Sequence, residues 1–235
     1  MEQEIRFTPL ELKIYQYIIA NPQQVIKFSL RRLAMKLDVS PSSVVRTLKR
    51  MGYQHYDDLC EQLKNNIKDS ANIDDITYQA QWYFNQPLSE LYNKKLDHFK
   101  ELAANCSDFV FIGIGTSGYL AEYGARQFGN NGKSAFVLSD PGYPVQFGKT
   151  SFENRVLIAL SVSGETKGII NQIINFRARG AKIVTITNDP SNTMASLSDL
   201  NFYYLLESKV IGYKINITSQ IPVIYLLERL SRTLN

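Results

Sequence analysis

Cysteine and histidine are scarce in this chain of 235 residues, which contains two of each. Cys60 and Cys106 lie far apart, and neither belongs to a Cys-x-x-Cys pair. The sequence therefore predicts neither a disulfide framework nor a thiolate metal site. His55 and His98 are also widely separated and lack the short spacing of metal-ligating histidines. We expect a reduced protein that binds no metal and requires no cofactor.

Long apolar runs and a secretory signal are missing as well. No apolar run approaches the roughly 18 residues that a membrane span needs. The first residues, MEQEIRFT, include two glutamates and no apolar core of a signal peptide. With 44% hydrophobic and 20% charged residues, the composition is that of a soluble globular protein. We therefore predict a cytoplasmic protein that does not engage a membrane.

The net charge is only +4, but the positive charge is unevenly distributed. Residues 1–77 are close to neutral, with 11 lysines and arginines against 10 acidic residues. Within them, residues 27–50 contain seven lysines and arginines and a single acidic residue, Asp38. Such a basic block on a near-neutral region favours an anionic partner. A solvated helix face would also account for it.

The N-terminal region has the signals of several short helices. The stretch TPLE at residues 8–11 is a capping box with proline at the first helical position. Ser29 is placed to cap a second helix, and Ser40, followed by proline, to cap a third that ends near Gly52. A fourth amphipathic segment follows, with Leu59, Leu63 and Ile67 on one side. The three residues 38–40 between the second and third helices predict a helix-turn-helix.

The second helix of such a motif lies in the major groove of DNA. Its apolar stripe is predicted to consist of Val44, Val45, Leu48 and Met51. The opposite surface carries the candidate DNA-binding residues Ser42, Ser43, Arg46, Lys49 and Arg50. Small hydroxyl side chains at the start of the helix would let it approach the bases closely, and Arg46 would read a guanine or grip a phosphate. The alternative is an ordinary helical hairpin with surface cations.

The rest of the chain has a different pattern. Residues 68–78 are polar and lack strong periodicity, so we place a domain boundary there, with one domain at 1–77 and a second at 78–235. After a helix through Leu88, Leu91, Leu96, Phe99 and Leu102, short apolar runs alternate with helical segments. We expect a parallel five-stranded sheet flanked by helices. The expected strands are 109–112, 135–138, 156–160, 183–186 and 202–206.

Two loops at the predicted carboxyl ends of strands have distinctive chemistry. The first, FIGIGTSG at 111–118, matches the G-x-G-x-x-G spacing of dinucleotide-binding loops, and Asp140 follows at a suitable distance. The second, LSVSGETKG at 160–168, clusters hydroxyls and glycines at the start of a helix. Together they would offer N–H and O–H donors to a phosphate. A monophosphate held between two loops explains the serine-rich second loop, which a dinucleotide site does not require.

These motifs carry a family resemblance. FIGIGTSG, LSVSGET and VTITNDPSNTMASLSD resemble the SIS (sugar isomerase) domain, which binds phosphosugars. With LAMKLDVSPSSVVRTLKRMGY at the front, nearly the whole chain resembles an RpiR-type transcriptional regulator. The resemblance implies an effector site made of Gly115, Thr116, Ser117, Ser161, Ser163, Gly164 and Thr166. At Val162 the sequence departs from sugar-phosphate enzymes of this superfamily that carry glutamine there.

The resemblance implies a regulator of sugar metabolism that binds double-stranded operator DNA under the control of a sugar phosphate, as a homodimer or homotetramer. We expect no enzyme activity, since no acid–base pair is recognisable. One alternative is a redox-sensing repressor that binds NAD(H), although Asp140 precedes Pro-Gly, which suggests a turn. Another is a phosphosugar isomerase with an accessory helical domain, for which His98, Glu207 and Glu228 are candidates by position. Glu165 does not discriminate between binder and enzyme.

Overall fold

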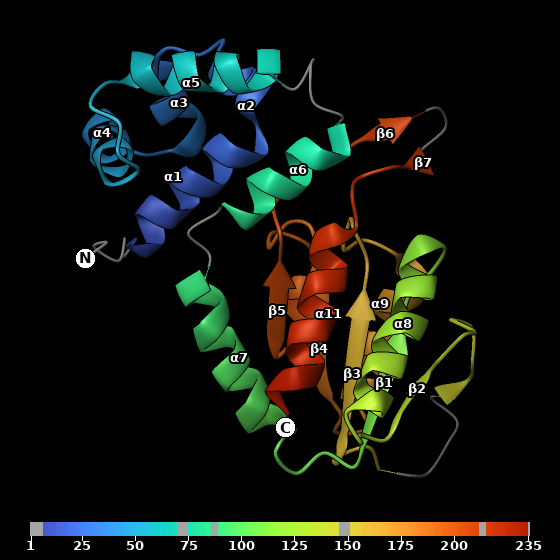
Figure 1. Ribbon diagram of the computed structural model, residues 1–235. Helices are drawn as coiled ribbons and strands as arrows, with labels where there is room; N and C mark the ends of the chain where they lie inside the picture. Colours follow the sequence, from blue (N-terminus) through green and yellow to red (C-terminus); the bar gives the residue numbers. More distant parts are fainter. Residues whose placement is uncertain (1–6, 70–74, 86–88, 146–150, 212–214, 235) are drawn as a thin grey trace. The chain divides into compact units, whose positions relative to one another are not determined.

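Figure 1 shows the computed structural model, which describes residues 7–69, 75–85, 89–145, 151–211 and 215–234. The chain divides into a helical unit, Met1–Pro87 with Leu205–Ile217, and a sheet unit, Leu88–Tyr204 with Thr218–Asn235. The domain boundary predicted between residues 77 and 78 lies within a helix, α6 (Asp75–Phe84), and stays a prediction. Within the described ranges, no helix is long and apolar enough to cross a membrane.

The helical unit contains short helices and a small hairpin. Its elements in the described residues are α1 (Pro9–Ala20), α2 (Pro22–Val25), α3 (Leu30–Leu37), α4 (Pro41–Arg50), α5 (Tyr56–Asp69), α6, β6 (Val210–Ile211) and β7 (Ile215–Asn216). The capping box predicted at residues 8–11 is confirmed: the hydroxyl of Thr8 accepts the Glu11 amide, and the Glu11 carboxylate accepts the Thr8 amide. These bonds satisfy amides that have no partner within the helix.

The turn between α3 and α4 contains residues 38–40, as predicted. Asp38 adopts a left-handed backbone (φ 53°), which aspartate tolerates better than most side chains do. The amide of Val39 then returns to the end of α3 through a 3.0 Å hydrogen bond to the carbonyl of Ala34. Ser29 and Ser40 cap α3 and α4, each accepting an amide bond from the third residue on, at 3.2 Å and 3.1 Å. The helix-turn-helix prediction is therefore confirmed.

Apolar side chains of α1 to α5 pack into one core. Its buried residues are Ile14, Ile18, Val25, Leu33, Ala34, Leu37, Val44, Leu48, Leu59 and Leu63. The stripe predicted on α4 is correct for Val44 and Leu48, but Val45 and Met51 are only half-buried. Thr47 is fully buried instead. Its hydroxyl donates to the carbonyl one turn earlier at 2.9 Å, so a polar residue can occupy the core-facing side of the helix.

The sheet unit is built on five parallel strands in the order β2-β1-β3-β4-β5, which confirms the predicted fold class. Its described elements are α7 (Ser89–Ala103), β1 (Asp108–Ile112), α8 (Thr116–Asn130), β2 (Ala135–Val137), β3 (Arg155–Leu160), α9 (Lys167–Arg177), β4 (Lys182–Thr187), α10 (Thr193–Leu197), β5 (Leu200–Tyr203) and α11 (Ile221–Thr233).

Alternate side chains of β1 pack on opposite faces of the sheet. The rings of Phe109 and Phe111 lie 4.9 Å and 5.0 Å from the ring of Phe128 in α8. Val110 and Ile112 belong to the core that also includes residues of α9. Helix α8 therefore covers one face together with α11, and α9 covers the other (Figure 1).

Three sequence predictions differ from the structure. The last strand ends at Tyr203 rather than Leu206, because Leu205 takes a positive φ of 53° that interrupts the extended chain. Residues 204–206 are buried all the same, which explains their apolar sequence. Helix α6 and the β6–β7 hairpin have no clear periodic signal and were not predicted.

Candidate functional site

The two loops singled out in the sequence leave the same edge of the sheet. Strands β1 and β3 are hydrogen-bonded neighbours, with Ile112 opposite Ala159, so residues 113–118 and 161–166 start side by side. The helices that follow them, α8 and α9, lie on opposite faces (Figure 1). In open α/β sheets, ligands bind at such a point, where successive connections run in opposite directions.

Glycines in the first loop allow α8 to begin close to β1. A Cβ atom on Gly113 would overlap the carbonyl oxygen of Ser117, so only glycine fits there. Gly115 has a positive φ of 61°, and its carbonyl accepts the amides of Gly118 and Tyr119, which closes the first turn of the helix. The G-x-G-x-x-G spacing is thus accounted for by local packing, without a dinucleotide.

Hydroxyl groups in the second loop are fixed by hydrogen bonds inside the loop. The Oγ of Ser161, a residue 5% exposed, accepts the amide of Gly164 at 3.2 Å and is 2.9 Å from the Oγ1 of Thr166. The Oγ of Ser163 accepts the amide of Glu165 at 3.2 Å. Ser163 is exposed, so its own O–H can donate outward. The loop therefore presents preformed hydroxyl donors.

Both helices that start at this edge begin without a side-chain cap. In the described residues, no side-chain hydrogen bond caps α8 at Gly115 or α9 at Thr166. The helices α3 and α4, in contrast, are capped by serines. The first amides of a helix carry partial positive charge and need acceptors. The candidate site thus has two helix N-termini and the hydroxyls of Thr116, Ser117, Ser163 and Thr166 to offer an anion.

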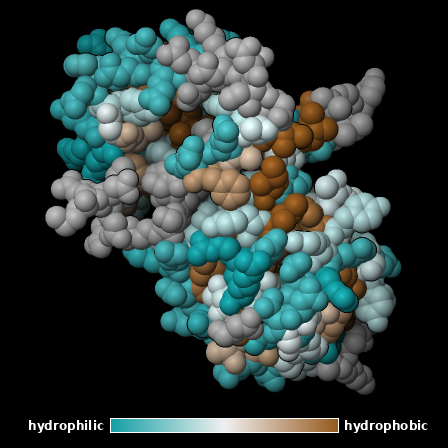
Figure 2. All heavy atoms as spheres, viewed as in Figure 1, coloured by the Kyte–Doolittle hydropathy of each residue, from teal (hydrophilic) through white to brown (hydrophobic). Residues whose placement is uncertain are grey.

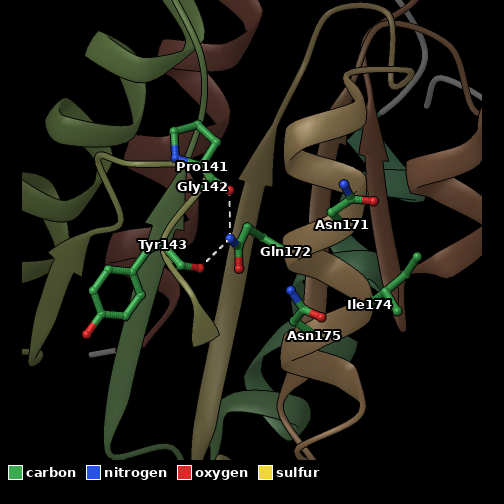
Figure 3. A pocket seen from close by; sticks show the side chains of 7 residues that line it. All are labelled: Pro141, Gly142, Tyr143, Asn171, Gln172, Ile174 and Asn175. Carbon is green, nitrogen blue, oxygen red and sulfur yellow. Dashed lines mark hydrogen bonds between the residues drawn. The ribbon is translucent and has the colours of Figure 1, made fainter. Parts of the chain in front are cut away.

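A glutamine that the sequence did not single out holds the neighbouring loop, which follows β2. The Nε2 of Gln172 donates to the carbonyl oxygens of Pro141 and Tyr143, at 2.6 Å and 2.8 Å (Figure 3). A pocket of about 360 Å³ lies here, lined by these residues and by Gly142, Asn171, Ile174 and Asn175. No lysine or arginine lines it. It is therefore a poorer site for an anion than the two loops.

The strand order bears on the dinucleotide alternative. The order 2-1-3-4-5 differs from the 3-2-1-4-5-6 order of the dinucleotide-binding fold. Asp140, the candidate ribose ligand of that alternative, accepts the amide of Gly142 at 2.7 Å. The predicted turn after Asp140 is confirmed, and its carboxylate is engaged in that turn.

The candidate DNA-binding residues lie on the surface of α4, with one addition to the prediction. The hydroxyls of Ser42 and Ser43 lie 2.9 Å and 2.8 Å from the Oγ of Ser40 at the start of the helix. Arg46 and Lys49 are exposed, and the surface over α4 is mostly hydrophilic in Figure 2. A groove-binding helix requires such an uncovered polar face.

Arg50 differs from the other candidates because it pairs with a buried carboxylate of α1. Its Nε lies 3.2 Å from the Oε1 of Glu11, a residue 4% exposed. Burial opposes the ionisation of Glu11, but hydrogen bonds from Thr8 and the charges of Arg50 and Arg46 outweigh it and lower the pKa of Glu11 below 4.5. Arg50 therefore ties α4 to α1, which the sequence did not indicate.

The residues considered for catalysis are dispersed. Glu228 in α11 accepts hydrogen bonds from Tyr123 at 2.8 Å and Arg232 at 2.7 Å. His98 is exposed on α7, before the first strand. Glu207 is exposed and belongs to the helical unit. Within the sheet unit, His98 and Glu228 lie on α7 and α11, away from the two loops in the chain, so no acid–base pair is formed there by these candidates.

Known proteins with similar sequences and structures share this arrangement. Residues 103–228 match the model of the SIS domain, and residues 2–70 match that of the helix-turn-helix domain of the rpiR family. The chain belongs to the rpiR family of transcriptional regulators. An uncharacterised HTH-type transcriptional regulator of Clostridium perfringens strain 13 is 26% identical, over 97% of this chain and 87% of that protein.

Two solved structures resemble this regulator over both units or over most of its length. The Vibrio vulnificus NanR protein complexed with ManNAc-6P is 22% identical, covers 97% of this chain and 86% of its own, and has a TM-score of 0.55. The E. coli CFT073 protein c3406 in complex with arabinose 5-phosphate is also 22% identical, with 77% and 91% covered and a TM-score of 0.55. At this identity the similarity shows the fold of the rpiR-family chain.

The pairing of Glu11 with Arg50 predicts an acid-sensitive helical unit. The folded-state pKa of Glu11 is lowered, so the ionised carboxylate stabilises the fold above about pH 4.5, and this contribution is lost as the pH falls below that value. Glu11→Gln should lower the stability near neutral pH by about 1 kcal/mol or more, through the weakened cap and ion pair. Thermal unfolding of this regulator across pH measures the effect.

The variant and the parent should converge in stability at acid pH. Arg50→Ala should reproduce much of the loss seen at neutral pH, whereas Arg46→Ala, on the exposed side of α4, should leave the unfolding midpoint nearly unchanged. A constant difference between Glu11→Gln and the parent at every pH would contradict the assignment.

Proposed function

We propose that this regulator binds operator DNA through α4, and that a sugar phosphate held by the loops after β1 and β3 changes its affinity for DNA. The observation that carries the effector half is the placement of fixed hydroxyls and uncapped helix ends on neighbouring strands. A phosphate needs several converging donors, and this edge of the sheet offers them from two directions.

The effector site that we propose consists of Gly115, Thr116, Ser117, Ser161, Ser163, Gly164 and Thr166. Ser161 lies mostly inside the loop and orients it, while Thr116 and Ser163 are exposed and face the ligand. Phosphosugars as the ligand class are supported by the two similar structures, each of which contains a sugar phosphate. Val162 supplies no polar contact, so the sugar itself would be recognised by other side chains.

The DNA-binding surface that we propose comprises Ser42, Ser43, Arg46 and Lys49, with Arg50 in a second role. Because Arg50 is paired with Glu11, it orients α4 as well as adding positive charge. Helix-turn-helix proteins bind paired half-sites, so a homodimer or homotetramer acting in the cytoplasm fits this function. A coupling free energy of about 1–3 kcal/mol between effector and DNA would suffice for control.

Replacement of cations on α4 should weaken DNA binding in two different ways. Arg46→Ala should cost about 1–3 kcal/mol on an operator duplex selected by the parent protein, if Arg46 contacts a base. Lys49→Ala should mainly reduce the salt dependence of binding, by about one phosphate contact. Fluorescence anisotropy at several salt concentrations measures both effects. Lys100→Ala, on α7, is the matched control, and parent-like binding by both α4 variants would contradict the assignment.

Loss of an exposed hydroxyl in the second loop should weaken effector binding. A hydrogen bond to a charged group contributes about 1.5–3 kcal/mol, so Ser163→Ala should reduce affinity for a bound sugar phosphate about tenfold or more. Ser107→Ala, just before the amino end of β1, should have no effect. Calorimetry with ManNAc-6P, arabinose 5-phosphate and other sugar phosphates measures this. Binding of NADH, with none of any sugar phosphate, would favour the redox-sensing alternative.

We also propose that this regulator does not turn its effector over. Phosphate binding alone stabilises substrate and transition state equally and does not accelerate a chemical step. An isomerase would exchange the proton beside the carbonyl group, so incubation with a bound sugar phosphate in deuterated water, followed by NMR, should show no uptake of deuterium. Protein-dependent uptake that is lost in Glu207→Gln, Glu228→Gln or His98→Asn would establish an isomerase instead.

A further inference from the structure

The proposed phosphate-binding loop contains a carboxylate, which needs an explanation. Glu165 lies between Ser163 and Thr166 and is exposed. A negative charge close to a bound phosphate is repulsive, even where water screens the two charges. A carboxylate in this position should therefore serve another purpose that outweighs the repulsion.

The structure shows both carboxylate oxygens of Glu165 occupied by one residue. Oε1 accepts the backbone amide of Thr193 at 2.7 Å, and Oε2 accepts the hydroxyl of Thr193 at 2.8 Å. Thr193 is the first residue of α10, 28 positions further along the chain. Hydrogen bonds from the Thr193 amide and hydroxyl also lower the pKa of Glu165, so the carboxylate is ionised near neutral pH.

Other contacts join the same two segments. The amide of Met194 donates to the carbonyl of Gly164 at 3.1 Å, and the amide of Asn188 donates to the carbonyl of Val162 at 3.0 Å. A Cβ atom on Gly164 would overlap the Oδ1 of Asn192, so glycine is needed for this close approach. Residues 162–165 are thus held against the segment that runs from β4 into α10.

We propose that Glu165 and Thr193 are positioning residues that hold the hydroxyls of the second loop in their phosphate-binding geometry. The amide of Glu165 donates to Ser163, and the amide of the preceding Gly164 donates to Ser161, so fixing Glu165 fixes both hydroxyl oxygens. Ligand groups that are already ordered lose less entropy on binding. This inference rests on the phosphate-binding function proposed above.

Glu165→Gln separates positioning from electrostatics because the two effects have opposite signs. If the charge of Glu165 acted only by repelling the phosphate, its removal would raise the affinity. The amide of glutamine has a single acceptor oxygen, so it cannot reproduce both bonds to Thr193. Positioning therefore predicts a lower affinity, about tenfold for Glu165→Ala and several-fold for Glu165→Gln.

Variants of Thr193 provide the matched set. Thr193→Ser retains the amide and the hydroxyl and should bind like the parent, whereas Thr193→Val retains only the amide and should bind more weakly. In a double-mutant cycle, Thr193→Val should cost much less in a Glu165→Ala background than in the parent, because the two side chains act through one contact. Asp97→Asn, an exposed carboxylate on α7, controls for the loss of charge.

The test is calorimetry of the full chain with ManNAc-6P and arabinose 5-phosphate, with the unfolding midpoint of each variant measured in parallel. The expected result is weaker binding by Glu165→Gln and Thr193→Val, parent-like binding by Thr193→Ser and Asp97→Asn, and no matching order in unfolding midpoints. Parent-like or tighter binding by Glu165→Gln, with binding intact in the parent, would overturn this inference alone. A parent that binds neither compound would overturn the inference together with the proposed function.

Discussion

The parallel pairing of β1 with β3 is the constraint on which the candidate effector site depends. It sets two loops that are more than forty residues apart in the chain at one edge of the sheet, and it directs α8 and α9 to opposite faces. Each loop alone would be an ordinary strand-to-helix connection. Side by side, their uncapped helix ends and hydroxyls converge, and a dianionic ligand becomes the natural occupant.

Each unit contains one carboxylate that joins segments distant in sequence. In the helical unit, Glu11 closes the cap of α1 and pairs with Arg50 at the end of α4. In the sheet unit, Glu165 accepts two bonds from Thr193 at the start of α10. Both carboxylates have a lowered pKa, since their hydrogen-bond donors favour the ionised form. A charge next to a proposed anion-binding surface thereby acts as a structural tie.

The sequence predicted those features that depend on neighbouring residues and missed those that depend on the fold. Capping residues, the turn at 38–40 and the glycine loop act over a few positions, so their patterns can be read directly. Arg50 was expected only at a DNA surface, because nothing local indicates its pairing with Glu11. Gln172 and Thr193 were missed for the same reason, since their partners lie 29 to 31 and 28 positions away. The strand ending at Tyr203 was misplaced because buried, non-paired residues continue its apolar run.

The central claim is that the edge shared by β1 and β3 binds a sugar phosphate, and ligand-induced stabilisation tests it most directly. A ligand that binds only the folded state raises the unfolding midpoint in proportion to its occupancy. In a thermal-shift titration of the intact chain, a sugar phosphate should raise the midpoint in a concentration-dependent way, while the unphosphorylated sugar and NADH should not. A rise with NADH and none with any sugar phosphate would contradict the account.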